Sequence, residues 1–280
     1  MTVEVRAYAK LNLALRVRGR RADGYHEIDS IVQTIDLADG LRLRVAEGDA
    51  VQVSNDLIGL QGPDLAERAA SALLAAKETT RDVEIEVTKR IPAGAGLGGG
   101  SSDAAAVLHH LDLAVPPRLP RDRLLAVAAG IGSDVPLFLV GGCVRVRGRG
   151  ERLNVCPQLR TETFALLVPP VHCSTASVYA AWRDHATPND QPCVLGENDL
   201  LYPALATHPA LLPYHQAIRG SGGTFAGMSG SGAAFYAAFS EPAAAHRAAA
   251  ALARSFPEAQ VLVCRPTAWG TRRVDTGGRT

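Results

Sequence analysis

The chain has 280 residues, which is long for one compact core and enough for two domains of ordinary size. Apolar residues make up 47% and charged residues 20%, a balance typical of a globular protein that excludes a disordered chain. Its 29 lysines and arginines face 28 aspartates and glutamates, a net charge of +1. This near balance argues against nucleic acid and against an anionic membrane as partners.

The first ten residues, MTVEVRAYAK, lack the apolar core that a secretory signal needs. The five cysteines are widely spaced and form no CxxC pair, which favours reduced thiols over disulfides or a structural zinc site. The eight histidines also lack ligand spacing. We therefore expect a soluble, cytoplasmic protein without a transition-metal centre, and we assign no residue as a ligand of such a metal.

The first half of the chain reads as strands followed by helices. Alternation over Val3–Gly19 predicts one or two strands, and alternation resumes after Ser30 with a turn signal at Asp39-Gly40. The next elements are a helix over Pro63–Glu78 and a strand in DVEIEVTKRIP, with Val83, Ile85 and Val87 on one face.

A glycine-rich stretch follows this strand, and the chain then returns to helices. Ser101 or Ser102 is a good N-cap for an alanine-rich helix that runs to about Leu113. A second helical run covers Leu124–Ala129, and IGSDVPLFLVGGCVRVRGRGERL then predicts a turn, an apolar segment and a strand pair.

The polar, irregular segment Gly148–Glu162 predicts a domain junction, giving domains 1–155 and 156–280. Beyond it we expect a strand in TFALLVPP, a short helix in STASVYAAWR, and a helical region over Asp199–Arg219 that prolines interrupt. The last expected elements are two strands around a glycine-serine turn, a helix capped by Ser240 and a final strand in AQVLVCRP. Two strands, a helix and a closing strand predict a split βαβ layer.

The glycine-rich stretch carries the strongest functional signal, with five glycines in the seven residues from Gly94 to Gly100. Glycines between a strand and a helix let successive N–H groups converge on a phosphate, where the helix N-terminus adds partial positive charge. A hinge or a tight packing turn is the alternative. The stretch also satisfies the dinucleotide pattern G-x-G-x-x-G, but a proline-broken loop stands where that fold needs an acidic residue. A Walker A loop would need G-K-[ST], which is absent.

The segment PAGAGLGGGSS resembles the signature P-x-G-x-G-L-G-S/G-S-S of the GHMP kinase superfamily. The resemblance implies a two-domain α+β fold with an N-terminal nucleotide-binding domain, a C-terminal split βαβ (ferredoxin-like) domain, and an active site in the cleft between them. It also implies ATP as phosphoryl donor, with Mg²⁺ inferred from ATP chemistry. The implied ATP-binding residues are Pro92, Ala93, Gly94, Ala95, Gly96, Leu97, Gly98, Gly99, Gly100, Ser101 and Ser102, the two serines also being the best candidates for a magnesium ligand.

Three further segments resemble one branch of this superfamily: AYAKLNLALRVRGRRADGYHEIDSIVQTIDL, IGSDVPLFLVGG and GMSGSGAAFYAAF. That branch phosphorylates the 2-hydroxyl of 4-diphosphocytidyl-2-C-methyl-D-erythritol in the non-mevalonate isoprenoid pathway. The resemblance makes Asp134 the catalytic base, although an Asp before Val-Pro also suits a turn residue that binds its own backbone. It places Lys10 beside Asp134, although a lysine in a strand is more often simply exposed to solvent.

The same resemblance assigns the substrate contacts. Tyr25 would stack on the cytosine, His26 would hydrogen-bond its edge, and Tyr179 would close the stack from the other side. Asn12 and Thr175 are weaker candidates for contacts with the methylerythritol and its phosphates. Asp64 replaces an Asn that relatives often carry near the adenine, and the motif NDL at 198–200 resembles the family without suggesting a role.

Two other functions stay open at this point. One is a different GHMP kinase, acting on homoserine, mevalonate or a sugar; the Tyr25-His26 pair argues against it because those substrates carry no base to stack. The other is a non-catalytic sensor that binds nucleotide, which would not need to keep both Lys10 and Asp134. The sequence does not indicate an oligomeric state.

Overall fold

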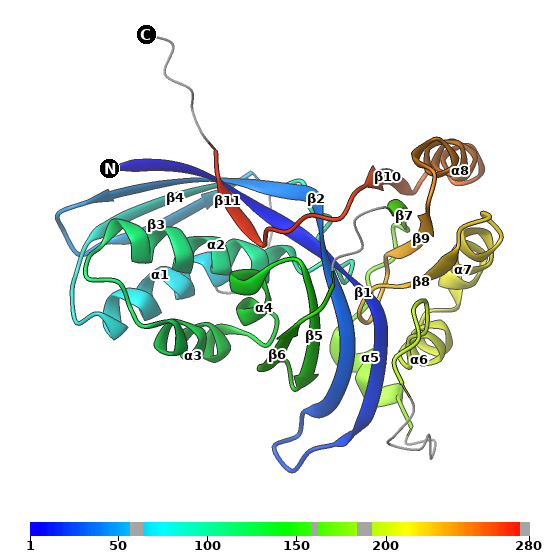
Figure 1. Ribbon diagram of the computed structural model, residues 1–280, viewed down its shortest axis with the longest axis horizontal. Helices are drawn as coiled ribbons and strands as arrows, with labels where there is room; N and C mark the ends of the chain where they lie inside the picture. The colour runs from blue at the N-terminus through cyan, green and yellow to red at the C-terminus, as the bar shows by residue number, and fades with distance from the viewer. Residues whose placement is uncertain (57–63, 158–161, 184–191, 275–280) are drawn as a thin grey trace, which may run out of the picture.

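The computed structural model describes residues 1–56, 64–157, 162–183 and 192–274. These residues form two β-sheets, of seven and four strands, each covered by helices. In Figure 1 the long hairpin of β1 (Thr2–Arg20) and β2 (His26–Ala46) runs down the middle, with one group of helices on each side. Within these residues, no helix combines the length and apolarity that a membrane crossing requires.

The first sheet has the strand order β11-β1-β2-β4-β3, and β5 adds to β2 and carries β6. Every pairing in it is antiparallel except β3 with β4. Its remaining strands are β3 (Val51–Asn55), β4 (Asp82–Thr88), β5 (Cys143–Gly148), β6 (Arg152–Val155) and β11 (Thr271–Arg273). Val83, Ile85 and Val87 of β4 are buried on one face, as the alternation predicts.

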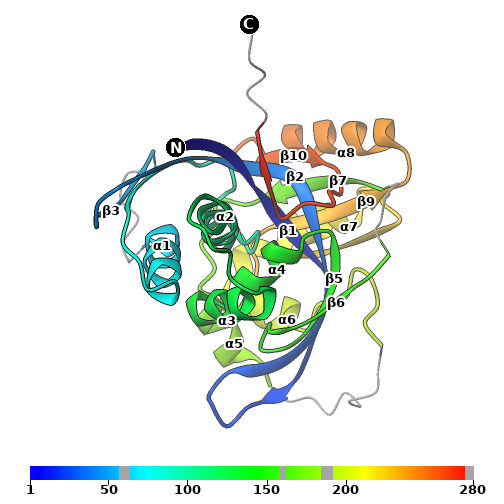
Figure 2. The ribbon, with the colours of Figure 1, turned by 60° about the vertical axis from the view of Figure 1, so that its left-hand side comes forward.

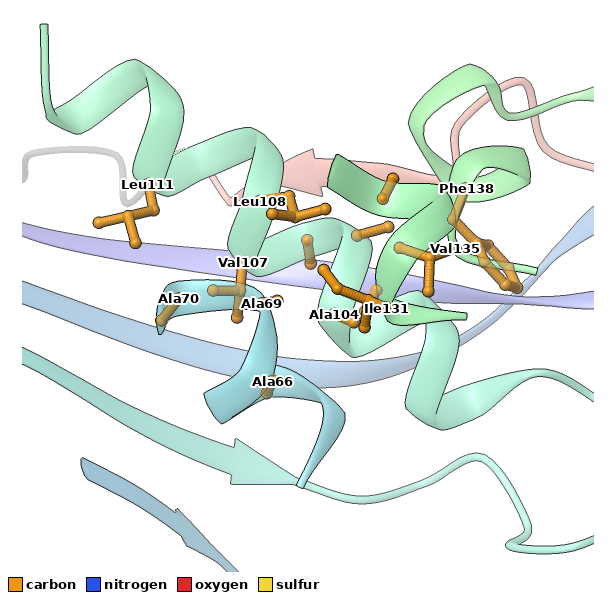
Figure 3. Close-up of a cluster of buried hydrophobic side chains, with 14 of the residues drawn as sticks. Ala66, Ala69, Ala70, Ala104, Val107, Leu108, Leu111, Ile131, Val135 and Phe138 are labelled. Atoms are coloured by element: carbon orange, nitrogen blue, oxygen red, sulfur yellow. The ribbon is translucent and has the colours of Figure 1, made fainter. Parts of the chain in front are cut away.

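Four helices cover this sheet: α1 (Leu65–Ala76), α2 (Gly99–Ala114), α3 (Arg121–Ile131) and α4 (Val135–Val140). Alanines such as Ala69 and Ala104 lie where α1 meets α2, and small side chains there allow the two helices to approach closely (Figure 3). Leu108, Val135 and Phe138 pack into the same core, which fixes α4 against α2.

The second sheet has the order β10-β7-β9-β8 with all neighbours antiparallel. Its chain order is strand, helices, two strands, helix and strand, so the predicted split βαβ layer is confirmed. In Figure 2, α8 lies on the side of this sheet away from α1 and α3. The elements are β7 (Thr163–Val168), α5 (Thr175–Ala181), α6 (Leu201–Thr207), η1 (Pro209–Leu211), α7 (Leu212–Arg219), β8 (Phe225–Met228), β9 (Phe235–Phe239), α8 (Pro242–Ser255) and β10 (Gln260–Cys264).

The two faces of the second sheet bury different partners. Leu167, Phe235 and their neighbours pack against helices α5 to α8. Phe164 and Tyr236, on the opposite face, pack against Ala9, Leu11 and Leu13 of β1 and against Ala95 and Leu97 of the glycine-rich loop. This shared core joins the two sheets and holds the loop between them.

Several local expectations were wrong. Asp39-Gly40 is not a turn, because β2 continues through it with partners on both sides. Neither serine caps α2: its N-cap is Gly98 in a left-handed conformation (φ +75°), without a side-chain cap. Ser240 does not cap α8 either, since the N-cap is Glu241. The apolar segment after Asp134, for which the sequence predicted no particular element, is the helix α4.

Other expectations differ in extent. The helix expected at Leu124–Ala129 spans Arg121–Ile131, and β11 was not predicted. Pro63, which opened the predicted first helix, and residues 158–161 of the predicted junction lie outside the described residues. A boundary between residues 155 and 156 stays a prediction; β11, close to the C-terminus, pairs with β1 of the first sheet.

Candidate active site

The glycine-rich loop alternates glycines of positive φ with buried apolar residues. Gly94, Gly96 and Gly98 have φ values of +66°, +75° and +75°, a region that side chains disfavour. Between them, Ala95 and Leu97 are buried at 3% and 1% exposure. Glycine therefore supplies the backbone conformation that this loop needs, and the residues between the glycines fasten the loop to the shared core.

The loop leads directly into α2, and its N–H groups suit a phosphate. The first N–H groups of a helix have no partner within the helix, and Gly98 offers no side chain to cap them. A Cβ at Gly98 would lie only 2.8 Å from the ring of Phe138, so glycine is required there. Ser101 is half-buried, whereas Ser102 is fully buried and donates its Oγ–H to the carbonyl of Tyr8.

Lys10 and Asp134 lie together beside this loop. Lys10 Nζ is 3.7 Å from Asp134 Oδ2, although the residues are far apart in sequence. Lys10 is buried in β1, and its N–H donates to the carbonyl of Leu97 in the loop. Asp134 stands at the start of α4 but makes no capping hydrogen bond, so its carboxylate, 44% exposed, is not engaged by its own turn.

Burial and the carboxylate of Asp134 shift the pKa of Lys10 in opposite directions. Burial lowers the pKa of the Lys10 ammonium below its usual value, and the charge of Asp134 partly opposes this shift. The ammonium also donates to Oδ1 of Asn12, whose Nδ2 donates to Ser30 Oγ. The predicted residues Lys10, Asn12 and Asp134 therefore form one connected group.

The aromatic residues form a second group nearby. The rings of His26 and Tyr179 lie 4.8 Å apart, tilted by 35°, and Trp182 contacts His26 edge-on at 5.5 Å. Burial, followed by the charge of Asp134, raises the pKa of the Tyr179 phenol. Burial and then the charge of Arg20 lower the pKa of His26. The sequence reasoning missed Trp182. The one feature of the sequence that points to it is its position three residues after Tyr179, which is about one helical turn.

Tyr25 and Thr175 have different neighbours. Tyr25 is 52% exposed, and the guanidinium of Arg149 lies 5.4 Å from its ring centre. Thr175 Oγ1 is 2.9 Å from Ser231 Oγ, in the turn between β8 and β9. The ring of Tyr25 thus lies beside Arg149, whereas Thr175 joins α5 to the C-terminal glycine motif.

A buried ion cluster behind the loop was also missed by the sequence reasoning. Lys89 Nζ pairs with Asp103 at 2.6 Å and with Asp39, while Asp39 Oδ1 accepts N–H groups from Arg90 and Ile91 just before the loop. Asp103 Oδ1 is buried without a hydrogen-bonding partner. Asp64, noted for its place near the expected adenine, accepts the N–H of Ala66 as the N-cap of α1.

Two surface hollows lie away from this site. One of about 470 Å³ lies between α1 and α3, near Arg68 and Val127, and no predicted site residue lines it. The described ranges also contain no cluster of three or more His, Cys, Asp or Glu side chains placed to hold a metal ion. The candidate site is therefore identified by its residues, namely the glycine loop with Lys10 and Asp134, and not by a deep surface hollow.

Comparison with known proteins agrees with this geometry. Residues 64–142 match the GHMP kinases N terminal domain and residues 194–258 match GHMP kinases C terminal. The 4-diphosphocytidyl-2-C-methyl-D-erythritol kinase of Solibacter usitatus is 36% identical over 267 residues, covering 87% of this chain and 83% of the relative.

Solved structures give the same result. A crystal structure of 4-(cytidine 5'-diphospho)-2C-methyl-D-erythritol kinase has 37% sequence identity and a TM-score of 0.76, covering 94% of this chain and 99% of the other. Homoserine kinase from Cytophaga hutchinsonii reaches a TM-score of 0.77 at 17% identity, covering 98% and 97% of the two chains, which shows the shared fold alone. The chain belongs to the GHMP kinases and, among them, to the 4-diphosphocytidyl-2-C-methyl-D-erythritol kinase family.

Proposed function

We infer that the chain transfers the γ-phosphate of ATP to the 2-hydroxyl of 4-diphosphocytidyl-2-C-methyl-D-erythritol, in the non-mevalonate isoprenoid pathway. The observation that carries this inference is the Lys10–Asp134 pair, 3.7 Å apart, beside a loop with three glycines of positive φ. A phosphoryl transfer needs a phosphate cradle, compensating positive charge and a group that orients the hydroxyl. The site supplies all three.

Each residue has a chemical task in this reaction. Asp134 accepts the proton of the substrate 2-hydroxyl while the hydroxyl oxygen bonds to the γ-phosphorus of ATP. The bond between the γ-phosphorus and the β,γ-bridging oxygen breaks, and ADP leaves with its electrons. Lys10, 3.7 Å from Asp134, offsets charge on the phosphoryl group. The N–H groups of the loop and of the α2 N-terminus bind the phosphates, and Ser101 is the more accessible serine for a Mg²⁺ held mainly by ATP.

The substrate contacts belong to the same proposal. Tyr25 and Tyr179 stack on the cytosine, and neutral His26 reads its edge, because an uncharged imidazole can both donate and accept a hydrogen bond. Asn12 and Thr175 contact the methylerythritol portion and its phosphates. The five cysteines are free thiols, which supports a reducing, cytoplasmic location.

A coupled ADP-release assay with three alcohols tests the proposal. We expect turnover with the cytidyl alcohol and none with homoserine or mevalonate at equal concentration. Turnover on mevalonate or homoserine alone would assign the chain to another GHMP activity. Nucleotide binding without turnover on any of the three would instead indicate a sensor.

A further inference from the structure

The motif Asn-Asp-Leu at residues 198–200 is held against the catalytic strand. The N–H of Gly196 donates to the carbonyl of Leu13 at 2.7 Å, and the N–H of Leu15 donates to the carbonyl of Glu197 at 2.9 Å. These bonds continue just beyond Lys10 and Asn12 along β1. The segment is therefore fixed in register beside the strand that carries the catalytic ammonium.

Both the nitrogen and the oxygen of the Asn198 side-chain amide form hydrogen bonds in this position. It is 8% exposed, and its Nδ2 donates to the carbonyls of Met228 and Gly230, both at 2.8 Å. Its Oδ1 accepts the N–H of Leu200 at 2.8 Å. The side chain thus fixes the first residues of the turn between β8 and β9 from a separate segment of the chain.

That turn touches both parts of the catalytic machinery. Ser229 Oγ donates to the carbonyl of Gly96 in the phosphate loop at 2.9 Å and accepts the N–H of Asn12 at 3.1 Å. A Cβ at Gly96 would lie 2.2 Å from the carbonyl oxygen of Ser229, so the loop and the turn are in direct contact. A Cβ at Gly230 would lie 3.4 Å from Lys10 Nζ.

We propose that Asn198 is a positioning residue, which sets the distance between the phosphate loop and Lys10 by fixing the Met228–Gly230 turn. The inference deepens the proposed function and rests on it. Asn198 reaches no reacting atom itself: it acts on the turn, and the turn acts on Gly96 and on Lys10. Displacements of about 1 Å in such a framework cost roughly 100-fold in rate.

Asn198→Asp tests this role with an isosteric change. The carboxylate keeps the acceptor for Leu200 but turns oxygen lone pairs toward the two carbonyls of the turn, which pushes the turn away. We expect kcat per folded molecule to fall about 10- to 100-fold. The KM for the cytidyl alcohol should change less than kcat, because the aromatic residues proposed to hold the cytosine lie on other elements. Asn198→Ala should act in the same direction.

Asp199→Asn is the matched control in the same segment. Asp199 accepts from Arg16 and from the N–H of Val17 and does not contact the turn. We expect this variant to unfold at a lower temperature with kcat unchanged. If both variants lose stability and both keep the wild-type kcat per folded molecule, Asn198 has only a structural role and the proposal is wrong.

A double-mutant cycle with Ser229→Ala tests the route. If Asn198 acts through the turn, Asn198→Asp combined with Ser229→Ala should lose no more activity than the worse single variant. Losses that multiply would show independent action and overturn the proposal. The wild type measured in parallel separates the two inferences, since a wild type that is inactive on the cytidyl alcohol refutes the proposed function itself.

Discussion

At the scale of single residues, the Lys10–Asp134 pair distinguishes a kinase from a nucleotide sensor. Asp134 is free of any capping bond and faces a buried ammonium. Its carboxylate is therefore available to a substrate hydroxyl, and its function can be removed without disturbing the start of α4.

Asp134→Asn should remove turnover and leave ATP binding intact. The amide keeps the size of the side chain but cannot accept the proton of the hydroxyl, so kcat should fall about 10²- to 10⁴-fold. The Kd for ATP, measured by calorimetry, should stay within a few-fold because the phosphate loop is unchanged. Asp122→Asn, on the exposed face of α3, is the control and should keep the wild-type kcat. An Asp134→Asn enzyme with near-normal kcat would contradict the base role.

His26 should make substrate affinity depend on pH. Burial and Arg20 lower its pKa, so the imidazole is neutral at pH 7 and gains a proton only below the usual histidine value of about 6.5. The KM for the cytidyl alcohol should then be flat from pH 7 to 8 and rise as the pH falls below that value. In His26→Gln the KM should be about 10-fold higher, which corresponds to about 1.4 kcal/mol, without the acid rise.

The readout for His26 is the KM for the cytidyl alcohol between pH 5 and 8, with the KM for ATP measured alongside. His246→Gln, an exposed histidine in α8, should behave as wild type. An acid rise that persists in His26→Gln would assign the titration to another group.

The sequence named candidate residues for this site but few of the contacts between them. Lys10 and Asp134 were paired only through the family resemblance, because no periodicity relates positions so far apart. Trp182 was missed, since its contact with His26 depends on how α5 packs near the β1–β2 turn. The hydrogen bonds of the Asn198 amide were also missed, because the carbonyls that accept them belong to Met228 and Gly230, far along the chain in the β8–β9 hairpin.

At the scale of elements, tertiary contacts override local signals around the phosphate loop. Asp39-Gly40 reads as a turn, but Asp39 directs its carboxylate to Lys89 and to N–H groups before the loop. Gly40 pairs with Arg6 on one side and Thr88 on the other, so the strand continues. Glycine in a left-handed conformation replaces the expected serine cap because α2 begins where Phe138 leaves no room for a side chain.

The ion cluster behind α2 should make stability depend on pH. Burial, with the charge of Asp39 acting in the same direction against the pull of Lys89, raises the pKa of Asp103 to about 7. The folded state then holds a proton that the unfolded chain has released between about pH 4 and 7. Since the folded pKa is the higher one, the contribution of Asp103 is fully present below the unfolded pKa and is lost as the pH rises through 7.

Asp103→Asn removes this titration. The free energy of unfolding of the variant, relative to wild type, should increase with pH between about 4 and 7, by up to roughly 1.4 kcal/mol per pH unit, and level off above 8. Urea denaturation at pH 5, 6, 7 and 8 measures the difference. A difference that is constant across this range would show that Asp103 does not titrate there.

At the scale of the whole molecule, the shared core links stability to catalysis. Leu97 is 1% exposed and packs with Phe164 and Tyr236 of the second sheet, while its carbonyl accepts the N–H of Lys10. The α+β architecture and the split βαβ layer could be predicted from element order and family resemblance. The sharing of one core by β1, the loop and the second sheet could not, because alternation along a strand does not say what will cover each face.

Leu97→Ala should therefore lower stability and activity together. Removing the buried side chain should cost about 2–5 kcal/mol of unfolding free energy, and the cavity lets the loop shift relative to Lys10. We expect kcat per folded molecule to fall at least about 10-fold, in line with the cost of misplaced catalytic groups.

Leu73→Ala is the matched control: Leu73 is fully buried in the core under the first sheet, separate from the core that holds the loop. It should lose similar stability, by urea denaturation, and keep its kcat. Equal losses of kcat in both variants would mean that general softening, and not the anchoring of the loop between the two sheets, limits the reaction.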